Sequence, residues 1–221
     1  MSTDLKRRNI PFSPPDMTEA EVKEVSDAIL SGWITTGPRT KKLEKLIADY
    51  VGVSGTSEIK KVPNCVCLNS QTACGEMALR VLGIGEADEV IVPAYTYTAS
   101  ASVVAHVGAT VRMVDVQPDC LEMDYDQLAD VINEKTKVIL PVDLGGIPCD
   151  YDRIYEIMKA KAHLFQPKND IQKKLGRVAV CCDAAHAFGA SRKGEKVGNI
   201  ADFSNFSSHT VKNFTTAEGA L

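Results

Sequence analysis

The feature that most constrains the fold is a repeating alternation of short apolar runs with segments whose apolar residues recur at helical spacing. The runs typical of buried strands cover residues 65–68, 89–92, 110–114, 137–140 and 178–182. Between them, apolar residues follow one face of a helix, as Met77, Leu79 and Leu82 do after the first run. This alternation predicts a three-layer α/β/α fold, in which helices cover both faces of a mostly parallel sheet.

Two further helices are expected before the first strand. The first is predicted to begin at Thr18, because Thr18 and Glu21 are spaced as a capping box, and to end at Gly32. The second covers roughly residues 40–50 and is expected to bury Leu43, Leu46 and Ile47 on one face, before a polar connection over residues 52–61. The chain thus divides into an N-terminal helical segment, residues 1–50, and a larger α/β domain, residues 51–221.

Composition excludes several classes of function. The 221 residues carry a net charge of −4 with both signs interspersed, so nothing indicates binding to nucleic acid or to an anionic membrane. We find no apolar run of membrane-spanning length and no signal peptide at the polar start. The seven cysteines match neither a metal site nor a disulfide framework. We expect a cytoplasmic protein with reduced thiols, no metal site and no contact with membranes.

Polar residues gather where the predicted strands end, and ligands of open α/β sheets bind at these carboxyl ends. Residues 69–72, residues 95–97, Asp143 and Asp183 all fall there. Residues 70–72 also open a helix, whose unpaired N–H groups favour a phosphate, although the same tripeptide could be a helix cap without a ligand. Tyr97 could stack on a planar ring or pack in the core.

The most informative set follows the strand at residues 178–182. Asp183 ends that strand, and Ser207 and Lys212 come five residues apart further along the chain. A lysine amine can bind an aldehyde covalently, and an aspartate can keep a pyridine nitrogen protonated so that the ring withdraws electrons. Singly, each residue is most often structural. As an ordered set, with Ser207 able to bind phosphate, they indicate pyridoxal 5′-phosphate.

Several motifs in this order resemble those of one family, the DegT/StrS-type nucleotide-sugar aminotransferases of the aspartate aminotransferase superfamily (fold type I). The resemblance extends from about residue 33 to the end of the chain. It rests on the helix opening at residues 69–73, the run at 82–97, the aspartate segment at 183–186 and the lysine segment at 212–219. Any one of these motifs alone would be weakly specific.

The resemblance implies a role for each site residue. Lys212 would form the Schiff base and then move the reacting proton, and Asp183 would hold the proton of the ring nitrogen. The remaining cofactor contacts would be phosphate binding by Gln71, Thr72 and Ser207, ring stacking by Tyr97 and a hydrogen bond from His186 to the ring hydroxyl. His186 could instead be a buried histidine bonded to the backbone.

The implied reaction transfers an amino group, typically from glutamate, to a keto group of a nucleotide-linked sugar, for amino-sugar or polysaccharide biosynthesis. Retention of Lys212 favours transamination over the dehydration catalysed by relatives that carry histidine there. Thr36, Gly37 and Asp143 are expected to face the substrate. This sequence departs from the family pattern at Asp143 and Gly146, where the family commonly has His and Tyr. Residues 164–175 are expected to form an extra polar loop.

Family members continue beyond the lysine segment, where this sequence stops at Leu221. The resemblance therefore implies a cofactor-binding large domain without its C-terminal small domain, from an enzyme that forms a homodimer. We expect the 221-residue chain alone to bind cofactor weakly and to turn over little. Two alternatives are a non-catalytic or binding-only fragment, and a nucleotide-dependent oxidoreductase. The second requires G-x-G-x-x-G after the first strand, and residues 69–75 lack it.

Overall fold

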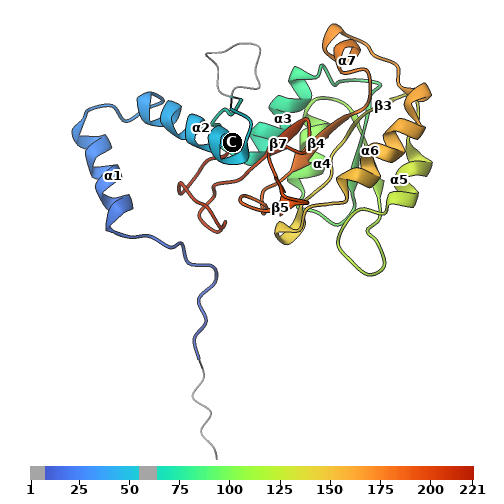
Figure 1. The fold of residues 1–221 in the computed structure, drawn as a ribbon. Coiled ribbons are helices and arrows are strands. Elements are labelled where there is room, and N and C mark those ends of the chain that lie inside the picture. Colours follow the sequence, from blue (N-terminus) through green and yellow to red (C-terminus); the bar gives the residue numbers. More distant parts are fainter. Residues whose placement is uncertain (1–7, 55–63) are drawn as a thin grey trace, which may run out of the picture.

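The computed structural model describes residues 8–54 and 64–221, and most of the expected connection at residues 52–61 lies outside these ranges. Its centre is a five-stranded sheet in the order β2-β1-β3-β4-β7 (Figure 1). All neighbouring strands in it are parallel. The strands are β1 (Glu89–Pro93), β2 (Thr110–Val114), β3 (Thr136–Ile139), β4 (Ala179–Asp183) and β7 (Phe203–Asn205). The expected mostly parallel sheet is confirmed.

Helices cover both faces of the sheet. On one face α3 (Gln71–Val81) and α4 (Ala99–His106) pack over alternate strand residues such as Val90 and Val92. On the other, α5 (Tyr125–Val131) and α6 (Tyr151–Ala160) pack over the residues in between, such as Ile91. Because successive strand residues point to opposite faces and both faces are covered, the inner strands β1 and β4 are apolar along most of their length. The three-layer α/β/α architecture is confirmed.

Two helices precede this body. Helix α1 (Glu19–Leu30) begins as expected, since the Thr18 N–H donates to the Glu21 carboxylate and the Thr18 hydroxyl accepts the Ala20 N–H. Helix α2 (Pro38–Val51) buries Ile47 and Val51. The expected apolar face of α2 is wrong at Leu46, which is 54% exposed, because the buried stripe runs through Glu44, Ile47, Ala48 and Val51 instead.

Two other sequence expectations need correction. Residues 65–68 do not join the parallel sheet: Leu68 makes a single antiparallel bridge to Ala220, and the Cys67 N–H donates to Glu44 Oε1 at 3.1 Å instead of to a strand. The segment at 164–175 is not only a loop, because it contains α7 (Asp170–Leu175). The buried Gln172 side chain ties α7 to the carbonyl of Leu82.

Short elements complete the fold: 3-10 turns η1 (Leu144–Gly146) and η2 (Ala162–Leu164), and a hairpin of β5 (Ser191–Arg192) and β6 (Glu195–Lys196). Among the helices of the described ranges, none has the length and apolar character needed to cross a membrane. The carboxyl ends of β1 and β4 and the loop after β7 meet at one edge of the sheet, and that edge carries the site described next.

Candidate active site

A cavity of about 430 Å³ opens at the carboxyl edge of the sheet, a volume typical of small-molecule sites. Every residue expected to bind cofactor lines it, and so does Asp143; these are Gln71, Thr72, Tyr97, Asp183, His186, Ser207 and Lys212. Thr36 and Gly37 do not line it. They lie just before α2, and Gly37 is the residue that precedes its first turn. Within this single chain the structure therefore does not bring those two to the site.

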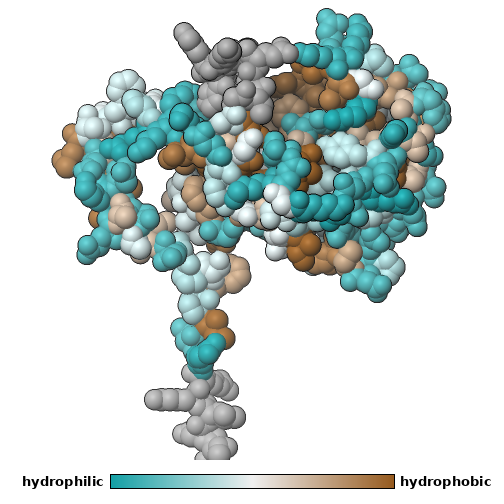
Figure 2. All heavy atoms as spheres, viewed as in Figure 1, coloured by the Kyte–Doolittle hydropathy of each residue, from teal (hydrophilic) through white to brown (hydrophobic). Residues whose placement is uncertain are grey.

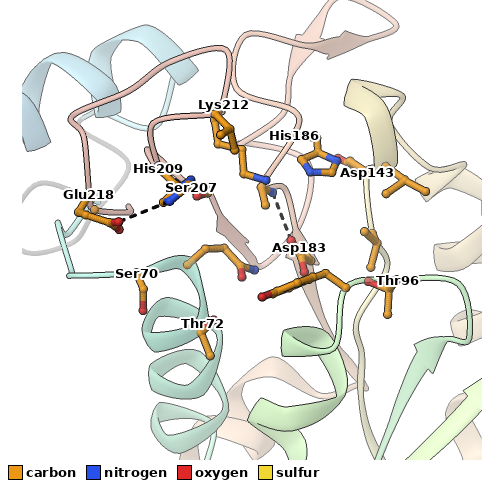
Figure 3. Close-up of a pocket in the computed structure, with 17 residues that line it drawn as sticks. Ser70, Thr72, Thr96, Asp143, Asp183, His186, Ser207, His209, Lys212 and Glu218 are labelled. Carbon is orange, nitrogen blue, oxygen red and sulfur yellow. Dashed lines mark hydrogen bonds and ion pairs between the residues drawn. The ribbon is translucent and has the colours of Figure 1, made fainter. Parts of the chain in front are cut away.

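Lys212 and Asp183 approach the cavity from different elements. Asp183 ends β4 and is 5% exposed, whereas Lys212 is carried by the loop after β7 and points toward Asp183 (Figure 3). Burial lowers the pKa of Lys212, and the charge of Asp183 opposes this. A lower pKa leaves more of the lysine as the free amine, which is the form that attacks a carbonyl.

The lysine loop is anchored by an aromatic cluster that sequence reasoning did not find. The Asn213 side chain donates to the carbonyl of Phe188 at 2.7 Å, and the Phe214 ring stacks on the Phe188 ring with centroids 4.7 Å apart. Tyr50 of α2 stacks on Phe188 as well, at 5.3 Å. These contacts place Lys212 by holding the two residues that follow it.

The first turn of α3 provides a place for an anion. Ser70 caps the helix, and its hydroxyl accepts the Ala73 N–H at 3.2 Å. In the described part of the chain, the N–H groups of Gln71 and Thr72 have no hydrogen-bond partner. With the hydroxyl of Ser207 in the same cavity, these groups suit a phosphate, which a helix N-terminus also attracts through its dipole.

The imidazole of His186 has a defined hydrogen-bond pattern. Its Nδ1 accepts the N–H of Gly145 at 3.3 Å, so in the neutral ring the hydrogen lies on Nε2. Burial lowers the pKa of His186, the charge of Lys212 lowers it further, and Asp183 opposes both. His186 thus combines a backbone contact with a neutral ring whose N–H can donate within the cavity.

The carboxylate of Asp143 is engaged inside the protein. It is 0% exposed, and its Oδ1 accepts hydrogen bonds from the Cys149 N–H and the Tyr151 hydroxyl, both at 2.9 Å. The Cys182 thiol donates to Oδ2 at 3.3 Å. Burial raises the pKa of Asp143. These bonds favour a role in holding the segment after β3 over a direct substrate contact, although Asp143 borders the cavity.

Several residues that line the cavity, and one that lies behind it, escaped the sequence analysis as functional candidates. Thr96 lines the cavity beside Tyr97, and His209 Nε2 lies 3.4 Å from Glu218 Oε1, as the dashed line in Figure 3 marks. Ser100, in the first turn of α4, donates to Asp183 Oδ2 at 2.7 Å. No local pattern singles out Ser100, because it sits in a run of small residues 83 positions from its partner.

The site fits pyridoxal 5′-phosphate on the structure's own terms. It offers a lysine with a lowered pKa, a buried carboxylate and unpaired N–H groups at a helix start, around one cavity. Within residues 8–54 and 64–221, no group of three or more His, Cys, Asp or Glu side chains could hold a metal ion.

Two sequence relatives have names that refer to a sugar aminotransferase and to polysaccharide biosynthesis. The UDP-4-amino-4-deoxy-L-arabinose–oxoglutarate aminotransferase of Shewanella sediminis is 35% identical over 96% of this chain and 48% of its own length. The spore coat polysaccharide biosynthesis protein SpsC of Bacillus subtilis is 33% identical over 98% of this chain and 50% of its own length. The chain thus spans about half the length of the curated relatives that it matches.

Solved structures agree as well. A putative sugar aminotransferase from Streptococcus pneumoniae, solved in PLP, PMP and apo forms, superposes with a TM-score of 0.90 at 55% identity. In its PLP form the match covers 96% of this chain and 52% of that one. The expectation of a pyridoxal-phosphate fold is therefore confirmed at the level of the family. A model of the DegT/DnrJ/EryC1/StrS aminotransferase family matches residues 15–221, and the chain belongs to that family.

Proposed function

We propose that this chain carries the cofactor site of a pyridoxal 5′-phosphate-dependent aminotransferase, which moves an amino group from an amino acid to a keto group of a nucleotide-linked sugar. The observation that carries the proposal is the approach of Lys212 to the buried carboxylate of Asp183 beside the unpaired N–H groups of α3. The sugar substrate class is supported by the printed names of the relatives. Glutamate is the proposed donor.

We assign each cavity residue a role from its position in the site. The amine of Lys212 would hold the cofactor by its aldehyde and, once released, would move the proton at the reacting carbon. Asp183 holds a proton on the ring nitrogen, and the bound cofactor supplies the electron-withdrawing ring. The N–H groups of Gln71 and Thr72 and the hydroxyl of Ser207 hold the phosphate. Tyr97 would stack on the ring, and the Nε2–H of His186 would donate to the ring hydroxyl.

The partners of the site are proposals of the same kind. We place the amino donor and the nucleotide sugar on the open side of the cavity, and we propose a cytoplasmic homodimer. Thr36 and Gly37 stay proposed substrate contacts, although within one chain they do not line the cavity. Asp143 borders the cavity, and we propose that it shapes the substrate side by holding the segment up to Cys149.

Replacement of Lys212 by alanine tests this function. Titration of the chain with pyridoxal 5′-phosphate into the millimolar range should produce the visible absorption band of a lysine-bound cofactor. The band should be lost in Lys212→Ala because no other amine faces Asp183 from within the described cavity lining. Lys173→Ala is the matched control, since Lys173 is exposed on α7 and paired with Asp170; it should leave the band unchanged.

Addition of glutamate separates catalysis from binding. Conversion of the band to that of the aminated cofactor is the expected result. A stable, unconverted band would instead favour the second candidate, a binding-only fragment, which the coverage of about half of each relative keeps open. The absence of any band in the unmodified chain would contradict the assignment of Lys212.

A further inference from the structure

The buried carboxylate of Asp183 is held by two different kinds of donor. Its Oδ2 accepts the hydroxyl hydrogen of Ser100 at 2.7 Å, and its Oδ1 accepts the N–H of Ala185 at 3.2 Å. Ser100 is 2% exposed and belongs to the first turn of α4, on the sheet face away from α6. Two bonds to different oxygens fix the rotation of a carboxylate in a way that one bond does not.

A second hydroxyl extends this contact to the cavity. Thr96 Oγ1 lies 2.8 Å from Ser100 Oγ. A serine hydroxyl has only one hydrogen, and that of Ser100 is used on Asp183, so Thr96 must be the donor to Ser100. The hydrogen bonds therefore run in one direction, from Thr96 to Ser100 to Asp183. Such chains polarise each other, and each bond is strengthened by the next.

We propose that Thr96 and Ser100 form a hydroxyl relay that positions Asp183, tying Oδ2 to α4 so that Oδ1 keeps a lone pair for the cavity. The proposal rests on the proposed function, in which Asp183 faces the ring nitrogen. Both hydroxyls are positioning residues, because they act through the carboxylate. Asp183 needs such support, since a carboxylate that turned or took up a proton could no longer hold the proton of a pyridine nitrogen.

Electrostatics around Asp183 agree with this role. Burial raises the pKa of Asp183, and the hydrogen bond from Ser100 is the largest of the effects that oppose it. The Ala185 N–H comes next, followed by the charges of His186 and Lys212. The first turn of α4, next to Asp183, contributes a hydroxyl but no charged side chain. The titratable residue of α4 is His106, which lies in the last turn.

The chain contains a matched control on the same helix. Ser102 also lies on α4, but it is only partly buried and donates to the carbonyl of Thr98 at 2.9 Å, the ordinary use of a helical serine. Ser100→Ala and Ser102→Ala therefore remove the same kind of atom from the same turn of one helix. Only the first removes a donor from Asp183. A general loss of helix stability would affect both variants alike.

The direct test is the protonation of Asp183 in the chain without cofactor. We would label the aspartate carboxyl carbons with ¹³C, assign Asp183 by comparison with Asp183→Asn, and follow its NMR shift with pH. Ser100→Ala should raise the midpoint by about one pH unit, which is a tenfold change in proton affinity. Ser100→Thr should restore the wild-type midpoint because it returns the hydroxyl, and Ser102→Ala should leave it unchanged.

A second pair of variants keeps the test decisive if the buried site does not tolerate changes at Ser100. Thr96 is partly exposed, and Thr96→Val removes its donor with little change in shape. A smaller rise in the Asp183 midpoint is expected for Thr96→Val, with recovery in Thr96→Ser. Unchanged midpoints in both Ser100→Ala and Thr96→Val would overturn the relay.

Cofactor binding supplies an independent readout. In Ser100→Ala the apparent Kd for pyridoxal 5′-phosphate, followed by the visible band, should rise by about tenfold, while Ser102→Ala binds like the wild type. A normal Kd in Ser100→Ala would count against the relay. The experiments distinguish failure of the proposed function from failure of the relay. The absence of a visible band in the wild-type chain contradicts the proposed function. The NMR midpoints test the relay alone, because they are measured without cofactor.

Discussion

Helices α1 and α6 begin with the same kind of local signal and have opposite fates. Each has a side-chain cap, from Thr18 in α1 and from Asp150 in α6, and each carries apolar residues at helical spacing. Helix α6 buries Ile154 and Ile157 against the sheet. Helix α1 stands away from the body in Figure 1 and buries no residue.

The apolar face of α1 is consequently open to solvent in this chain. Val22, Val25 and Ile29 are each at least 59% exposed. Apolar side chains are visible at the left of Figure 2, where α1 lies in Figure 1. Caps and periodicity are enough to specify a helix, whereas its tertiary stability comes from burying the face. The comparison teaches that local signals predict where a helix lies, and say little about how much it contributes to the folded body.

The largest expected effect is in α6. Ile154→Ala should lower the free energy of unfolding by about 2–5 kcal/mol, because Ile154 is 0% exposed and its truncation leaves a cavity. Urea denaturation followed by far-ultraviolet circular dichroism measures the change. A loss below about 1 kcal/mol would mean that α6 is not the rigidly packed partner in this comparison.

An effect of intermediate size is expected from Asp143, which makes the stability of the region around α6 depend on pH. The pKa of Asp143, which accepts from Tyr151 of α6, is raised by burial, so its contribution to stability is complete below the unfolded pKa of about 3.9 and is lost as pH rises. Asp143→Asn should therefore flatten the fall in unfolding free energy as the pH rises above about 4.

The stability of helix α1 should depend on pH in the opposite direction. The Thr18 hydrogen bonds lower the pKa of Glu21, so its contribution is present above the unfolded pKa of about 4.3 and is lost as pH falls. Because Glu21 is exposed, Glu21→Gln should change only the helicity of α1, which amide NMR follows as the pH is lowered through and below about 4.3. Equal slopes for Asp143→Asn and the wild type would contradict the assignment to the buried carboxylate.

The smallest expected effect is in α1. Ile29→Ala removes the same atoms as Ile154→Ala from a side chain that is 62% exposed. The free energy of unfolding of this chain should change by no more than about 0.5 kcal/mol, as for other surface substitutions. The same urea titration measures it. A loss as large as that of Ile154→Ala would show that the face of α1 is buried in solution.

Much of the candidate site could be predicted from the sequence. Lys212, Asp183 and the α3 opening at Gln71 and Thr72 stand next to strong local patterns, such as a buried strand or a helix cap, and the structure brings them to one cavity. Ser100 and Phe188 could not be predicted, because their roles depend on partners far away in the chain. Asp143 was found, but its hydrogen bonds into the core were not.

By itself, the sequence determined the layered α/β fold, the capped starts of α1 and α3 and some of the residues that line the cavity, such as Asp183 at the end of a buried strand. Hydrophobic period and cap chemistry act between neighbours in the chain, so they can be read from the sequence. Tertiary structure alone decided that residues 65–68 leave the parallel sheet for Ala220 and that Leu46 stays exposed. It also decided that Asp183 is held from α4. These outcomes depend on which distant surfaces meet, and a local pattern carries no information about that.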